Sequence, residues 1–161
     1  MPEATFRFYA ELNDFLPAQW RQRSFRHCFD SHASVKHIIE SLGVPHTEVD
    51  LILINGSPVG FNYRVSDKDM VSVYPMFERL DITGASRLRA KPLRDPRFVL
   101  DTHLGKLAAY LRMLGFDALY RNDFCDEELA VISSQQKRTL LTRDRGLLKR
   151  NLVTHGAYIR E

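Results

Sequence analysis

The pattern of apolar residues changes part-way along this 161-residue chain, and this change constrains the possible folds more than any other feature of the sequence. Up to residue 75, short strand-like segments surround one helical stripe. After Pro96, short apolar segments alternate with helical stripes. Residues 81–96, between the two patterns, contain Gly, Ser, two prolines and four basic residues with no apolar period, as is typical of a linker. We therefore predict two domains, residues 1–80 and 97–161, joined by a basic linker.

The first domain contains four segments with the features of strands. The opening segment alternates apolar and polar side chains, as a half-buried strand does, and the second can return as its hairpin partner. The third is an apolar run that ends at Asn55 and Gly56, a pair that favours the positive φ angles of a type I′ turn. The four segments are residues 5–10, 22–29, 49–54 and 70–74.

One helix is predicted between the second and third of these strands. Its apolar residues recur at the spacing i, i+3, i+4, i+7, with Ser34 as a candidate N-cap and Gly43 as a C-terminal stop. The stripe consists of Val35, Ile38, Ile39 and Leu42. A small sheet wrapped on a single helix is an α+β fold with the β-grasp plan, and we predict this plan for residues 1–80.

The second domain alternates strands with helices. Its first predicted helix carries an apolar stripe that ends before Gly115, which suits a helix C-terminus. The stripe consists of Leu104, Leu107, Ala108, Leu111 and Leu114. The predicted strands are residues 97–101, 117–120, 139–142 and 157–159, and the other helices start near residues 126 and 146. This alternation predicts a parallel α/β sheet with right-handed connections.

Aspartates follow three of these strands. Asp101 ends the first strand, Asp123 and Asp126 follow the second, and Asp144 follows the third. The carboxyl ends of parallel strands share one edge of a sheet, where ligands bind, so these acids are expected to converge. Crowded carboxylates repel one another unless they are protonated or neutralised by a cation. Their hard oxygens suit Mg²⁺ or Mn²⁺, which can activate water and stabilise charge on a phosphodiester.

Each of these acids also has a structural explanation when it is taken alone. Asp126, before Glu-Glu-Leu, suits a helix N-cap, and Asp123 suits a turn. Asp101 and Asp144 can each cap the helical segment that follows. Capping does not explain why these two acids stand at matching strand ends. The support for a metal site is therefore the expected convergence of several acids, and no single acid provides it alone. From the residues alone, capping and metal binding have equal weight.

The two domains differ in charge. Residues 1–80 hold 8 Lys and Arg against 10 Asp and Glu, whereas residues 81–161 hold 15 against 10. A basic half favours an anionic partner such as nucleic acid. Arg143, Arg145 and Lys149 stand near the acids in sequence and can hold a phosphate backbone. Lys106 and Arg112 lie off the leucine stripe and face either phosphate or solvent. The candidate RNA-binding residues are Lys106, Arg112, Arg143, Arg145 and Lys149.

Two features that the sequence lacks bear on where the protein is expected to be located. No apolar run approaches the ~20 residues that a membrane-spanning helix needs. The two cysteines, Cys28 and Cys125, lie far apart and form no CxxC pair, so neither a disulfide framework nor a zinc site is indicated. A reducing, cytoplasmic location is the simplest expectation.

The second domain contains the motifs LD-x-x-LGKLA-x-x-LR-x-LG at 100–115, D-x-x-D-EEL at 123–129 and LLTRDRxLLKR at 140–150. With these motifs it resembles the Mut7-C RNase domain, a branch of the PIN-like nucleases. This resemblance implies a PIN-like α/β fold and a ribonuclease dependent on Mg²⁺ or Mn²⁺. It also implies that Asp101, Asp126 and Asp144 are catalytic metal ligands, with Asp123 as a fourth ligand. The alternative is a catalytically inactive RNA-binding or adaptor module.

The first domain resembles the ubiquitin-like domain that often precedes this nuclease, itself similar to small sulfur carriers. Those carriers end in an exposed Gly-Gly, which residues 1–80 lack, so we expect a docking or RNA-contacting role and no sulfur transfer. Members commonly continue into a Cys-rich zinc ribbon, which is absent before Glu161. The small second domain is therefore expected to be a truncated form, or to rely on the β-grasp domain, a second copy or a protein partner.

Overall fold

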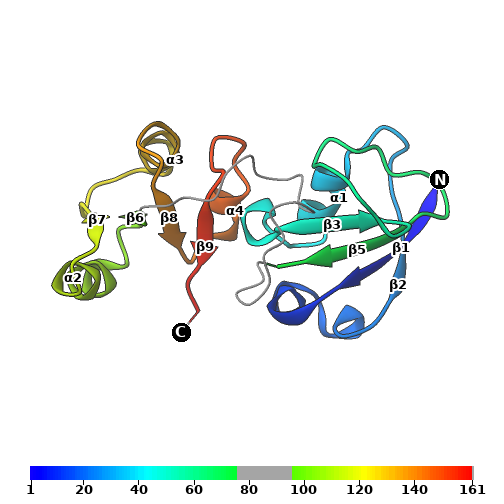
Figure 1. Ribbon diagram of the computed structural model, residues 1–161, viewed down its shortest axis with the longest axis horizontal. Coiled ribbons are helices and arrows are strands. Elements are labelled where there is room, and N and C mark those ends of the chain that lie inside the picture. Colours follow the sequence, from blue (N-terminus) through cyan, green and yellow to red (C-terminus); the bar gives the residue numbers. More distant parts are fainter. Residues whose placement is uncertain (76–95, 161) are drawn as a thin grey trace. The chain divides into compact units, whose positions relative to one another are not determined.

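The computed structural model describes residues 1–75 and 96–160 (Figure 1). The chain divides into two compact units, Met1–Lys91 and Pro92–Glu161. Apart from Pro96, the predicted linker lies outside the described residues. No helix in the described ranges is long and apolar enough to cross a membrane.

The first unit is a five-stranded mixed sheet with one α-helix. Its strands are β1 (Glu3–Phe8), β2 (Phe25–Cys28), β3 (Leu51–Ile54), β4 (Ser57–Pro58) and β5 (Met70–Tyr74), and its helix is α1 (Val35–Ser41). Short 3₁₀ helices span Ala10–Phe15, Ala18–Trp20 and His46–Glu48. The strand order is β2-β1-β5-β3-β4, with β1 and β5 parallel and the other pairs antiparallel. A hairpin on each side of a central parallel pair is the β-grasp topology, as predicted.

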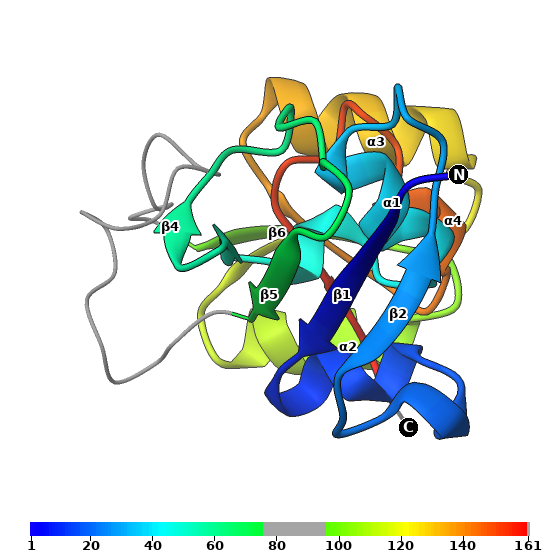
Figure 2. The same ribbon diagram turned by 90° about the vertical axis from the view of Figure 1, so that its right-hand side faces the viewer.

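Local signals in the sequence explain this unit. The Ser34 hydroxyl accepts a hydrogen bond from the His37 amide at 3.2 Å and caps α1, which lies on one face of the sheet (Figure 2). The apolar stripe of the helix is buried there with Phe6 and Phe8 of β1. Asn55 and Gly56 have φ angles of 51° and 87°, so the predicted turn between β3 and β4 is confirmed.

The second unit is a four-stranded sheet in which every neighbouring pair of strands is parallel. Its elements are β6 (Arg97–Leu100), α2 (Gly105–Met113), β7 (Asp117–Leu119), α3 (Asp126–Gln135), β8 (Thr139–Thr142), α4 (Arg145–Leu148) and β9 (Gly156–Tyr158). The strand order is β7-β6-β8-β9. The predicted parallel α/β fold is therefore confirmed. The chain moves from β6 outward to β7 and returns to β8 on the other side of β6.

Alternate residues of the two central strands supply two separate cores. Val99 of β6 and Leu140 of β8 are buried in a cluster with residues of α3 and α4. Their neighbours Leu100 and Leu141 are buried in a second cluster, which holds Ala108 of α2. Successive side chains of a strand point to opposite faces, so α2 covers one face and α3 with α4 covers the other. Burial on both faces explains why the central residues of both strands are apolar.

One predicted core position is wrong. Leu114 was expected to continue the buried stripe of α2, but it is 74% exposed, whereas Leu104 and Ala108 are buried. The helix ends at Met113, and Gly115 (φ +90°) turns the chain into the edge strand β7. Leu114 therefore lies on the turn after the helix, with its side chain in solvent.

Candidate active site

The carboxyl ends of β6 and β8 lie side by side at the point where the order of the strands reverses. Leu100 pairs with Leu141, and the Asp101 amide donates to the Leu141 carbonyl at 3.0 Å. In open α/β sheets, ligands bind in the crevice outside the strands at such a switch point. Asp101 and the residues that follow β8 thus stand at the position where this fold places its sites.

A buried hydroxyl joins these two strand ends. Thr142, the last residue of β8, is 0% exposed, and its Oγ1 donates to Oδ2 of Asp101 at 2.7 Å. The same oxygen accepts from the Asp144 amide at 3.0 Å. Oδ1 of Asp101 accepts from the Thr102 amide at 2.7 Å. One threonine therefore fixes the Asp101 carboxylate and the backbone of Asp144 with respect to each other.

Asp144 is a helix cap that keeps one oxygen available. Its Oδ1 accepts from the amides of Gly146 at 2.8 Å and Leu147 at 3.2 Å, so Asp144 caps α4 as one explanation expected. In the described chain its other oxygen, Oδ2, has no hydrogen bond or ion pair. A carboxylate has about four acceptor positions, so capping leaves Asp144 able to bind a second group.

The capping explanations for Asp126 and Asp101 are wrong. α3 begins at Asp126 itself, and the N-cap position belongs to Cys125, whose side chain makes no capping bond. In the described residues Asp126 has neither a hydrogen bond nor an ion pair from its side chain. α2 has Leu104 at its N-cap, and the Asp101 carboxylate binds the two threonines instead. The sequence pattern suggested caps because an acid stands near the start of both helices. The N-cap of α2 lies three residues after Asp101, and the N-cap of α3 lies one residue before Asp126.

A pocket of ≈ 770 Å³ brings the three acids together. Asp101, Asp126 and Asp144 line it, with the predicted RNA-binding residues Arg143 and Arg145. The remaining lining residues are Thr102, His103, Leu104, Phe124 and Gly146. Acids from three separate parts of the chain and two arginines thus face one space, large enough for a phosphate group with its neighbouring sugar.

The donor set of the pocket suits a hydrated divalent ion. Within residues 1–75 and 96–160, no group of three or more His, Cys, Asp or Glu side chains is arranged to hold a metal ion. Mg²⁺ demands less of a protein, because it usually keeps several waters and takes one or two carboxylates plus substrate phosphates. Asp126 and Oδ2 of Asp144 offer such carboxylate oxygens, and hard oxygen ligands suit Mg²⁺ and Mn²⁺.

Other predicted site residues lie elsewhere. Asp123 does not line the pocket; it forms an ion pair with Arg121 at 2.8 Å, and both side chains are 60% exposed. Lys106 is exposed in the first turn of α2. Nε of Arg112 donates to the Ala118 carbonyl at 2.9 Å, and Lys149 is half-buried at the end of α4.

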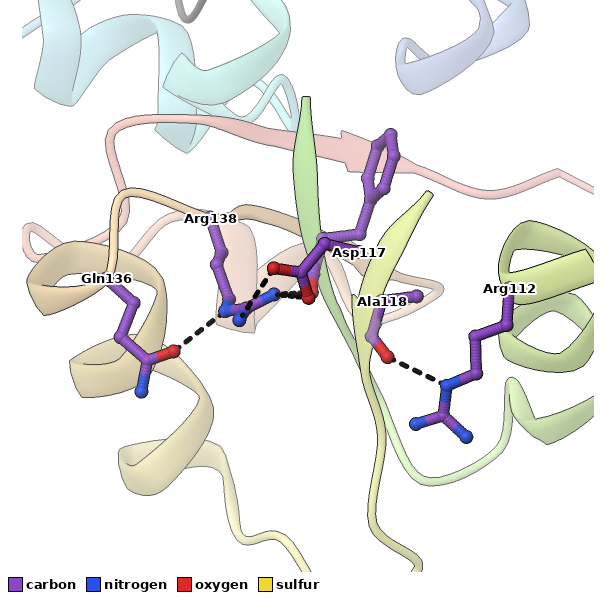
Figure 3. A network of polar contacts seen from close by, with 6 residues as sticks. Arg112, Asp117, Ala118, Gln136 and Arg138 are labelled. Atoms are coloured by element: carbon purple, nitrogen blue, oxygen red, sulfur yellow. Dashed lines mark hydrogen bonds and ion pairs between the residues drawn. The ribbon is translucent and has the colours of Figure 1, made fainter. Parts of the chain in front are cut away.

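The opposite, amino-terminal edge of the same sheet holds an ion pair that sequence reasoning missed. The side chain of Arg138 is 10% exposed, and it donates to Asp117 at 2.8 Å, to the Phe98 carbonyl at 3.0 Å and to Gln136 at 2.8 Å (Figure 3). The hydrogen bond from Arg138 lowers the pKa of Asp117 below its ordinary value. This arrangement ties the start of β7 to β6 and to the residue before β8.

Thr142 was also missed by sequence reasoning. The signal that could have found it is a hydroxyl residue at the end of a buried strand, two positions before Asp144. Phe124 was missed as well; its ring lines the pocket, and the Arg121 guanidinium lies 5.5 Å from the ring centroid. Neither residue carries a charge, so charge and metal-ligand patterns did not identify them.

Comparison with protein families accounts for nearly the whole chain. The family model described as Mut7-C ubiquitin matches residues 1–81, and the model described as Mut7-C RNAse domain matches residues 96–161. The chain belongs to the Mut7-C family. Its two domains follow one another in the predicted order, and the Mut7-C RNAse domain supports a nuclease-type function with RNA as the substrate class.

Solved structures similar to the chain match the Mut7-C ubiquitin half. The small archaeal modifier protein 1 of H. volcanii is 16% identical, with a TM-score of 0.38, over 48% of this chain and 100% of that chain. A second structure, SAMP1 from Haloferax volcanii, is 16% identical, with a TM-score of 0.37, over 47% of this chain and 97% of that chain. No curated protein matches the sequence.

Proposed function

We propose that the Mut7-C RNAse domain is a ribonuclease dependent on Mg²⁺ or Mn²⁺, with Asp101, Asp126 and Asp144 as the residues that hold the metal. The observation that carries this proposal is that acids following β6, β7 and β8 line one pocket at the switch point of the sheet. None of the three is neutralised by an ion pair with a described residue. Carboxylates that line one pocket without an ion pair offer hard oxygen ligands to a divalent cation.

The residues of the pocket have different roles in the proposed reaction. A bound Mg²⁺ or Mn²⁺ supplies a water of lowered pKa and stabilises charge on the phosphate. Thr142 holds the Asp101 carboxylate in place through its 2.7 Å hydrogen bond, and the cap on α4 holds Asp144. Arg143 and Arg145 position the RNA backbone, because guanidinium groups form paired hydrogen bonds to phosphate oxygens.

The experiment that tests the proposal is Asp144→Asn, since asparagine also serves as an N-cap and keeps α4 capped while removing the charge. We expect loss of Mn²⁺-dependent RNA cleavage together with weaker Mn²⁺ binding by calorimetry. Asp123→Asn is the matched control, because Asp123 lies outside the pocket in an exposed ion pair. Cleavage and Mn²⁺ affinity that survive in the Asp144→Asn protein would show that the catalytic assignment is wrong.

A second candidate function is an RNA-binding or adaptor module without catalysis. The observation that favours it is the lack, in the described parts of the chain, of any three-acid group arranged around a metal position. RNA binding that weakens with rising salt, without cleavage in Mg²⁺ or Mn²⁺, selects this alternative. Turnover that depends on the metal rejects it.

A further inference from the structure

The solvent-facing side of α2 carries large apolar side chains that the folded unit leaves uncovered. Tyr110 is 63% exposed and Met113 is 81% exposed, and Lys106 is exposed one turn before Tyr110. Residues three and four positions apart share a helix face, so Lys106, Tyr110 and Met113 form one row, the α2 stripe. At a rise of ~1.5 Å per residue the stripe spans roughly 10 Å.

The α2 stripe begins next to the pocket. His103 and Leu104, the two residues before the start of α2, both line the pocket, and Lys106 lies in the first turn of the helix. An extended ligand that leaves the pocket along α2 meets a cation first and an aromatic ring second. Roughly 10 Å corresponds to about three nucleotides at the ~3.4 Å per nucleotide of a stacked strand.

The charge along this segment is of one sign. Between residues 102 and 116 the charged side chains are Lys106 and Arg112, both positive, and no acid occurs. The next acid, Asp117, is occupied by Arg138. A surface that combines cations with an exposed aromatic ring suits single-stranded nucleic acid, because lysine contacts phosphate and a tyrosine ring stacks on a base of any sequence.

The neighbouring edge strand disfavours extension of the sheet by a second copy of the chain. An open strand edge invites pairing with another strand unless it is blocked. Nε of Arg112 donates to the Ala118 carbonyl of β7 at 2.9 Å, so a side chain from α2 occupies that backbone acceptor (Figure 3). Extension of the sheet through β7 would have to break this hydrogen bond.

We propose that the α2 stripe binds the nucleotides flanking the scissile phosphate, with Lys106 on a phosphate and Tyr110 stacked on a base. The proposal rests on the ribonuclease function proposed above and adds where the substrate leaves the pocket. If the α2 stripe binds these nucleotides, the enzyme should prefer a long RNA strand to a dinucleotide, because a dinucleotide fills the pocket without reaching Tyr110.

The test compares long oligouridylate with the dinucleotide UpU. We expect Tyr110→Ala to lower the ratio of kcat/KM for the long strand to that for UpU by about tenfold, as loss of one stacked base predicts. Binding of the long strand to Asp144→Asn protein, measured by fluorescence anisotropy, should weaken by about the same factor when Tyr110→Ala is added. Tyr110→Phe keeps the ring and should restore both values. Leu152→Ala, at a 53% exposed residue outside the pocket and the stripe, is the control.

The outcomes separate this inference from the proposed function. If Tyr110→Ala changes neither the substrate ratio nor the binding while UpU is still cleaved, the α2 stripe assignment is wrong and the ribonuclease stands. If no RNA is cleaved in Mn²⁺ yet binding depends on Tyr110, the stripe is an RNA surface and the ribonuclease proposal fails. Absence of RNA binding, or a change in oligomeric state on sedimentation with Tyr110→Ala, overturns the stripe assignment in favour of a protein interface.

Discussion

The two edges of the four-stranded sheet use arginine and aspartate in different ways. At the amino edge, Arg138 is buried and bonded to Asp117, to a carbonyl of β6 and to Gln136. At the carboxyl edge, Arg143 lines the same pocket as Asp101 and Asp144, but neither acid forms an ion pair within the described chain. Aspartate is paired with a buried arginine at the amino edge, whereas the pocket acids at the carboxyl edge have no ion pair with a described residue; the Arg121–Asp123 pair lies outside that pocket.

This difference indicates which edge serves stability and which serves function. The guanidinium of Arg138 has its carboxylate, carbonyl and amide acceptors within the fold, so it has little capacity left for a ligand. The pocket acids are oriented by neutral donors, namely threonine hydroxyls and backbone amides, which fix their positions without cancelling their charge. Carboxylates that line a cleft without an ion pair are candidates for binding a cation or another ligand.

The largest effect is expected from Asp101→Asn. The amide keeps the shape of the carboxylate but loses its charge, so we expect kcat/KM for RNA to fall by at least about 100-fold, more than the loss of a residue that only orients a metal ligand typically causes. The free energy of unfolding should change little. Asp117→Asn, at the opposite edge, is the control and should leave kcat/KM near that of wild type. Equal losses from both variants would remove the functional difference between the edges.

Thr142→Val should have the next largest effect. Valine fills the same buried space but cannot donate to Asp101 or accept from the Asp144 amide, so the two strand ends lose their shared hydrogen bond. We expect kcat/KM and Mn²⁺ affinity to fall by about 10- to 100-fold. Thr142→Ser keeps the hydroxyl and should recover most of the loss, and Thr139→Val tests the same change at the start of β8. Normal activity in Thr142→Val would show that orientation of Asp101 does not matter.

Arg138→Met should affect stability rather than catalysis. Methionine fills much of the buried space, but the Phe98 carbonyl loses its hydrogen bond, and such a loss costs about 1–3 kcal/mol of unfolding free energy. Urea titration followed by circular dichroism measures this change. The activity per folded molecule should stay close to wild type, and a large fall in kcat with unchanged stability would contradict the structural role.

The smallest effect concerns pH. Because Arg138 lowers the pKa of Asp117 in the folded state, the ion pair contributes stability above the ordinary aspartate pKa of about 3.9 and loses it as the pH falls below that value. The urea midpoint of Asp117→Asn should therefore lie below that of wild type at about pH 5, and this difference should shrink as the pH falls to about 3. A difference that stays constant across this range would show that the pair contributes nothing to the acid response.

The sequence allowed the strands and the convergence of the acids to be predicted, because the carboxyl ends of parallel strands must meet at one edge. It did not reveal the Arg138–Asp117 pair or the Thr142–Asp101 hydrogen bond, whose partners lie 21 and 41 residues apart. No local pattern specifies which side chains meet across such distances. The predicted start of α3 near residue 126 is confirmed, but the N-cap is Cys125 and not Asp126, because an aspartate suits both the N-cap and the first helical turn.

The most direct test is paramagnetic broadening of the amide resonances by Mn²⁺ in a ¹⁵N-labelled protein. We expect the amides of Thr102, Gly146 and Leu147 to broaden first, and Asp144→Asn to weaken this response. Amides near Asp117 at the opposite edge should keep their intensity at the same Mn²⁺ concentration. Broadening that begins at Asp117, or that spreads evenly over the exposed acids, would contradict a metal site at the carboxyl edge.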